Sequence, residues 1–150
     1  MRLRRTFFFF ASTVCLAFFL ATPCFAHHIA VIVDKDNKTG NITSAHLVKI
    51  FKGEVKKWPD GKSVVFVLRD NSDEIATLAH LTKMTTAEVK SMIEERKDSI
   101  LRKASDAEVI DAVATTPGAI GMVEEHSISG RVTVVKVDGK LPLEAGYLPH

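Results

Sequence analysis

The stretch SVVFVLRDNSDEIATLAHL, residues 63–81, decides the fold class of this protein. Its first part is apolar at nearly every position up to Leu68, which is typical of a strand buried on both faces of a sheet. From Ser72 to Leu81 the apolar residues recur at helical spacing. A buried strand that passes directly into a helix predicts an α/β protein.

The junction RDNSDE, residues 69–74, permits two interpretations. A helix N-terminus offers unpaired backbone N–H groups, and a neighbouring arginine offers a forked donor that suits phosphate or carboxylate. In this interpretation Arg69, Asn71 and Ser72 are candidate anion-binding residues. In the other, Ser72 caps the helix, Asp73 and Glu74 favour its first turn, and Arg69 pairs with one of these acids.

The rest of the chain alternates strands and helices in the same way. Strands are expected at 27–33, 63–68, 119–123 and 131–137, and helices at 44–53, 72–81, from 85 through 101, and 105–115. Capping boxes formed by Thr85 with Glu88 and by Ser105 with Glu108 open the last two helices. Together these elements predict a three-layer α/β sandwich with a mainly parallel sheet.

The N-terminal residues 1–26 are typical of a signal peptide. Three arginines precede an apolar run over residues 7–20, and cleavage is expected after Ala26. The sequence therefore predicts a periplasmic protein whose residues 27–150 form one domain. The export route, general secretory or twin-arginine, is open.

Cleavage would change the chemistry of the chain. Cys15 and Cys24 leave with the signal, so the mature protein has no disulfide and no thiol nucleophile. Of the 20 basic residues, 17 remain against 18 acids, a net charge of −1 that gives no indication of nucleic-acid binding. The new N-terminus would be His27, and its amine and imidazole, with His28, are a candidate copper site. No other cofactor is indicated.

Three further motifs carry a family resemblance. IFKGEVKKWPDGKSVVFVLRD (50–70), TTPGAIGMV (115–123), and VVKVDGKLP followed by Tyr147 occur in this order. They resemble the substrate-binding proteins of phosphate ABC transporters, which are two-lobed type II periplasmic binding proteins, and they cover one lobe. In that family an arginine precedes Ser-Gly-Thr at a helix start. Arg69 and Ser72 match in kind, but the spacing is one residue shorter and Asp73-Glu74 replace Gly-Thr.

The resemblance implies binding rather than catalysis. The expected ligand is phosphate or another small anion, and the expected partner is an ABC transporter permease or another membrane protein. Two alternatives remain open: a copper binder through His27, and a lobe-like adaptor that has lost its ligand. No enzyme motif such as G-x-S-x-G or a phosphate-binding P-loop occurs. The oligomeric state, and whether a second copy rebuilds a cleft, are open.

We expect His27 to be the first residue of the exported protein, because Ala26 is a small residue at the cleavage position. Mass spectrometry of the exported chain checks this. A mass that retains residues 7–20 would instead identify this segment as a membrane anchor.

Overall fold

The computed structural model describes residues 28–149. The expected signal peptide and His27 lie outside these residues. The strands are β1 (Ile29–Asp34), β2 (Asn41–Ile42), β3 (Val65–Arg69), β4 (Ile100–Lys103), β5 (Ala119–Glu124), β6 (Val132–Val134) and β7 (Lys136–Val137). The helices are α1 (Ser44–Lys52), α2 (Ser72–Thr82), α3 (Thr86–Glu95), α4 (Asp106–Thr115) and the 3₁₀ turn η1 (Glu125–Ser127). Within the described part of the chain, no helix is both long and apolar enough to cross a membrane.

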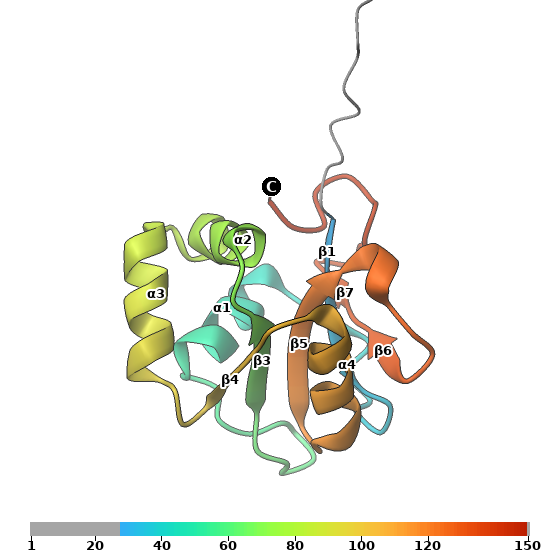
Figure 1. Cartoon of the computed structure of the whole chain (residues 1–150). Coiled ribbons are helices and arrows are strands. Elements are labelled where there is room, and N and C mark those ends of the chain that lie inside the picture. Colours follow the sequence, from blue (N-terminus) through green and yellow to red (C-terminus); the bar gives the residue numbers. More distant parts are fainter. Residues whose placement is uncertain (1–27, 150) are drawn as a thin grey trace, which may run out of the picture.

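Five strands form the central sheet in the order β4-β3-β5-β1-β6, as Figure 1 shows in part. β3 runs parallel to both β4 and β5, whereas β1 is antiparallel to β5 and β6. β1 is therefore the one reversed strand of this sheet, and the expected mainly parallel arrangement is confirmed. β2 and β7 form a separate parallel pair.

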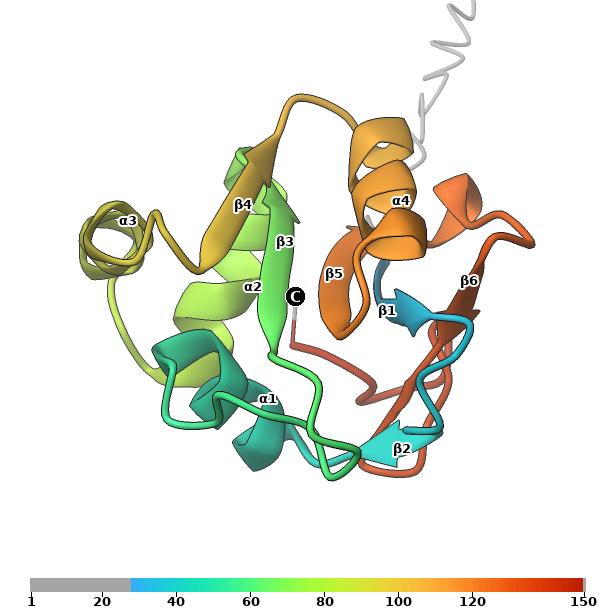
Figure 2. The same cartoon turned by 90° about the horizontal axis from the view of Figure 1, so that it is seen from below.

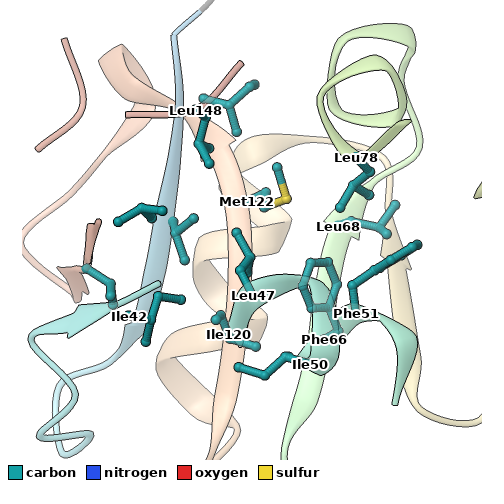
Figure 3. Close-up of a cluster of buried hydrophobic side chains, with 14 of the residues drawn as sticks. Ile42, Leu47, Ile50, Phe51, Phe66, Leu68, Leu78, Ile120, Met122 and Leu148 are labelled. Atoms are coloured by element: carbon teal, nitrogen blue, oxygen red, sulfur yellow. The ribbon is translucent and has the colours of Figure 1, made fainter. Parts of the chain in front are cut away.

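Helices cover both faces of the sheet, which confirms the three-layer architecture. Figure 2 shows α4 on one side and α1 and α2 on the other. Along β3 the side chains alternate: Phe66 and Leu68 pack against α1 and α2, and Val67 packs against α4. In Figure 3, Phe66 lies beside Phe51 of α1, with ring centroids 5.5 Å apart in an edge-on contact. Because both faces are buried, the strand is apolar at successive positions.

Two glycines allow β5 to pack closely. A Cβ on Gly121 would lie 2.8 Å from Val113 Cγ2, so α4 rests directly on the strand at this point. Gly118 has φ +80, and a Cβ there would lie 2.2 Å from the backbone oxygen of Ser63. The backbone therefore approaches its neighbour closely at the start of this strand.

The structure corrects several sequence-based boundaries. The expected helix from Thr85 ends at Glu95, and Ile100 and Leu101 belong to β4, where they pair with Phe66 and Val67 of β3. Ile100 and Leu101 continue the helical spacing of the apolar residues before them, but they pair with β3 instead. The local sequence pattern gives no sign of this pairing. The expected strand 131–137 is divided at Val135 into β6 and β7, which join different sheets.

The helix caps are also partly corrected. Thr43 caps α1 and Asn71 caps α2, each one residue before the expected serine. The capping box of Thr85 and Glu88 is confirmed. At α4, Ser105 caps as expected, but the Glu108 carboxylate accepts from the backbone N–H of Ala104.

A tyrosine hydroxyl completes the sheet where β6 is interrupted. Tyr147 Oη accepts from the Val31 N–H at 2.9 Å and donates to the Val135 carbonyl at 2.8 Å. The Val135 N–H donates directly to the Val31 carbonyl. Burial raises the pKa of Tyr147 to about 12, so the hydroxyl stays protonated and can donate at neutral pH.

We expect Tyr147→Phe to lower the free energy of unfolding by about 1–3 kcal/mol, because it leaves a buried N–H and a buried carbonyl unpaired while keeping the ring. Urea unfolding measures the change. Equal stability of the two proteins would show that the hydroxyl bridge contributes nothing net.

Candidate functional site

The ends of several elements meet at one edge of the sheet. β3, β4 and β5 are parallel, so their carboxyl ends lie together, the position where open α/β sheets bind ligands. Arg69 is the last residue of β3 and Glu124 is the last of β5. Helices α2 and α4 both begin at this edge, and Asp106 is the first residue of α4.

Three carboxylates surround the guanidinium of Arg69. Nη2 donates to Glu124 Oε1 at 2.5 Å, and Nη1 lies 3.2 Å from Asp106 Oδ1. Nε lies 3.7 Å from Glu74 Oε1, and the Arg69 backbone N–H donates to Glu74 Oε2 at 2.8 Å. The second oxygen of Asp106 accepts from the Glu124 N–H at 3.1 Å. We call these four residues the Arg69 cluster.

The Arg69 cluster is largely withdrawn from solvent. The side chain of Glu74 is 0% exposed and that of Arg69 is 19% exposed. Burial raises the pKa of Glu74 to about 8, which outweighs the opposing effect of Arg69, while Asp106 and Glu124 raise it further. Burial also opposes the charged form of Arg69, but its three carboxylate contacts prevail and raise its pKa. The guanidinium therefore stays charged, and Glu74 holds a proton over much of the neutral range.

The three expected anion-binding residues lie together, but in different roles. Asn71 caps α2, and its side-chain oxygen accepts from the Glu74 N–H at 3.0 Å. Ser72 is exposed, and its hydroxyl lies 3.3 Å from Asp73 Oδ1. The interpretation in which Ser72 is the cap is wrong, because Asn71 holds that position. Of the two acids proposed as partners for Arg69, Glu74 makes the contact.

Sequence reasoning missed Asp106 and Glu124 as members of the cluster. Each carried a signal, because one follows the capping serine Ser105 and the other ends the strand AIGMVE. Residues in these positions gather at the carboxyl edge of a parallel sheet. What the sequence did not supply is the strand order that places β5 beside β3.

The expected copper site lies partly outside the residues that the structure describes. His27 is not among residues 28–149, and the His28 carbonyl accepts from the Glu125 N–H at 2.7 Å. Within the described residues, no group of three histidine, cysteine or acidic side chains is arranged to hold a metal ion. His126 Nε2 lies 3.3 Å from Glu124 Oε2, at the outer side of the Arg69 cluster.

Known structures share this fold. An ABC-type phosphate transport receptor from Vibrio cholerae is 18% identical, with a TM-score of 0.62 over 77% of this chain and 48% of the receptor. PstS from Borrelia burgdorferi is 25% identical, with a TM-score of 0.62 over 77% of this chain and 49% of that protein. A phosphate-binding protein from Stenotrophomonas maltophilia is 15% identical, with a TM-score of 0.60 over 77% and 40% of the two chains.

This chain therefore spans about half the length of the first two structures. The comparison with curated protein sequences finds no significant match. The family described as the PBP superfamily domain matches residues 19–142, which is well over half of the chain. The resemblance inferred from the motifs is confirmed, and this protein belongs to the PBP superfamily domain family.

Proposed function

We propose that this protein is an exported binding protein that acts through a partner protein and does not use Arg69 to hold phosphate. The observation that carries this proposal is that the guanidinium of Arg69 is already engaged by Glu74, Asp106 and Glu124. An arginine whose donors face three internal carboxylates has little left to offer a second anion.

The positions of these carboxylates support the same conclusion. Glu74 lies in the first turn of α2, and Asp106 lies in the first turn of α4. Helix N-termini favour negative charge there, and a bound phosphate would compete with these carboxylates for the same positive helix ends and the same arginine. The carboxylates thus occupy, within the protein, the place of a small anion. A phosphate dianion would have to displace them or bear their repulsion.

The proposed partner follows from the likeness to transport receptors. The receptor from Vibrio cholerae is an ABC-type phosphate transport protein, and this chain has the fold of about half of it. We infer a membrane-bound transporter component, such as a permease, as the partner, with the periplasm as the location. The protein works by binding rather than by catalysis.

Anion binding at the Arg69 cluster is the second candidate function. It is favoured by the location of Arg69 at the carboxyl edge of the sheet, beside the first turns of α2 and α4. In this reading phosphate would bind only after the three carboxylates had moved or taken up protons. Replacing Arg69 separates the two candidates.

We expect Arg69→Gln to lower the free energy of unfolding by about 3–5 kcal/mol, because it removes the counter-charge of buried carboxylates. It should leave any phosphate affinity, measured by titration calorimetry, unchanged. The matched control is Arg131→Gln. It breaks an ion pair with Asp111 in which both side chains are more than half exposed, and it should cost about 0–1 kcal/mol.

A loss of phosphate affinity without a loss of stability would contradict this prediction. Phosphate binding by the parent protein that disappears in Arg69→Gln, with little loss of stability, would assign Arg69 to the anion. If Arg69→Gln does not fold, Arg69→Lys tests the phosphate affinity instead: it keeps the counter-charge of the carboxylates but removes the fork that a bound phosphate would use.

A pH dependence follows from Glu74. Its folded pKa of about 8 lies above the ordinary value of 4.5, so the folded state binds the proton more tightly than the unfolded chain. The stability from this group is complete at acidic pH and is lost as the pH rises towards about 8, by up to about 1.4 kcal/mol per pH unit. Glu74→Gln, which mimics the protonated form, should flatten this decline.

Urea unfolding of the parent and Glu74→Gln proteins over a pH series measures this difference. The remaining charged groups of the cluster, Arg69, Asp106 and Glu124, with His126 beside Glu124, are common to both proteins. Parallel pH profiles for the two proteins would show that Glu74 is already ionised in the folded state.

A further inference from the structure

A second arginine, Arg96, lies between α3 and β4, at the end of the sheet where the parallel strands β3 and β4 begin. It follows α3, and its guanidinium reaches over the end of α1. Nη2 donates to Ser99 Oγ at 3.0 Å, and Nη1 lies 3.5 Å from the Ile50 carbonyl. The Ser99 N–H donates to the Arg96 carbonyl at 2.9 Å, so both the backbone and the side chain are held.

The turn after α1 is shaped to receive this guanidinium. Gly53 ends α1 with φ +76, and a Cβ there would lie 2.6 Å from Arg96 Cζ and 2.7 Å from Nε. A side chain at this position would push the guanidinium away. The absence of a Cβ therefore allows the guanidinium of Arg96 to lie against the turn.

Arg96 differs from the other arginines of residues 28–149 in having no carboxylate partner. Arg69 contacts three carboxylates, Arg102 pairs with Asp70 and Glu94, and Arg131 pairs with Asp111. Within the described residues, no ion pair includes Arg96. Burial lowers its pKa, with no carboxylate to offset the effect. A half-buried cation without a counter-ion favours any anion that can reach it.

An anion can reach it through a pocket of about 490 Å³. Arg96 lines this pocket together with Gly53 and Ser99. The other charged lining residues are Lys52, Lys56, Glu95 and Asp98. A guanidinium has five N–H donors, of which Ser99 Oγ and the Ile50 carbonyl take two. Nε of Arg96 forms no hydrogen bond within the described residues and is not among their buried unpartnered atoms, so this donor is open to solvent.

We propose that this pocket binds a small oxyanion of the phosphate or carboxylate type, with Arg96 as its anchor. The planar fork presents parallel donors that match such a group, and Lys52 and Lys56 add positive charge at the rim. Glu95 and Asp98 limit the total charge the pocket can accept. The site lies far along the sheet from the Arg69 cluster and does not depend on the function proposed there.

The experiment is a titration of the ¹⁵N-labelled protein with inorganic phosphate and, separately, with acetate, at constant ionic strength. We expect saturable shifts of the backbone amides of Gly53, Arg96 and Ser99. Arg96→Gln should weaken the binding by about tenfold or more. Arg96→Lys keeps the charge but not the fork, and it should also bind more weakly. The two anions distinguish a phosphate-type from a carboxylate-type ligand.

The matched control is Arg102→Gln. Arg102 is an exposed arginine of β4, and it does not line this pocket. Arg102→Gln should bind both anions as the parent does. Absence of saturable shifts with either anion, or unchanged shifts in Arg96→Gln, would overturn the proposal and leave Arg96 as a cap for α1. Loss of binding in Arg69→Gln, but not in Arg96→Gln, would instead place the anion at the Arg69 cluster and overturn both proposals.

Discussion

The contact between Arg69 and its three carboxylates joins two strands and two helices at one edge of the sheet. β3 supplies the arginine, α2 supplies Glu74, α4 supplies Asp106 and β5 supplies Glu124. α2 and α4 cover opposite faces of the sheet, so one guanidinium ties both outer layers to the central one. Each acid is buried and would be costly without this cation, and the cation is held in turn by the acids.

This mutual dependence also limits what the edge can bind. With Glu74 protonated, the cluster has one formal positive and two formal negative charges. With Glu74 ionised, it has one positive and three negative charges. Glu74 Oε1, Asp106 Oδ1 and Arg69 Nε are buried and form no hydrogen bond within the described residues. The hydrogen-bonding capacity of the cluster is therefore not fully used, and the proton on Glu74 lowers the free-energy cost of burying that carboxyl group. At this edge, where open α/β sheets often bind ligands, the charged side chains contact one another.

The two half-buried arginines, Arg69 and Arg96, are held by different kinds of contact. Arg69 is neutralised by carboxylates, whereas Arg96 is seated by a glycine turn, a serine hydroxyl and a helix carbonyl. A helix C-terminus carries partial negative charge and stabilises a nearby cation, but it does not replace a full counter-charge. Surface arginines such as Arg131 need neither arrangement, because water screens them. Carboxylate partners, rather than burial, therefore distinguish Arg69 from Arg96, which we propose is open to a ligand.

The sequence by itself determined the α/β class, the position of the buried strands and most helix starts. These depend on periodicity, on capping side chains and on the φ > 0 that Gly53 and Gly118 allow, all of which act over a few residues. The motifs around residues 50–70 and 115–123 were enough to identify the family. The candidate edge could be located because Arg69 ends an apolar strand and precedes a helix.

Tertiary structure alone decided the strand order, the reversal of β1, the existence of β4 and the partners of both arginines. Ile100 continues the apolar spacing of α3, and only its pairing with Phe66 makes it a strand residue. Asp106 and Glu124 are 37 and 55 positions away from Arg69 along the chain. Local sequence fixes backbone preferences over a few residues, whereas the charge around a buried group is set by residues that sheet pairing and layer packing bring together from distant positions.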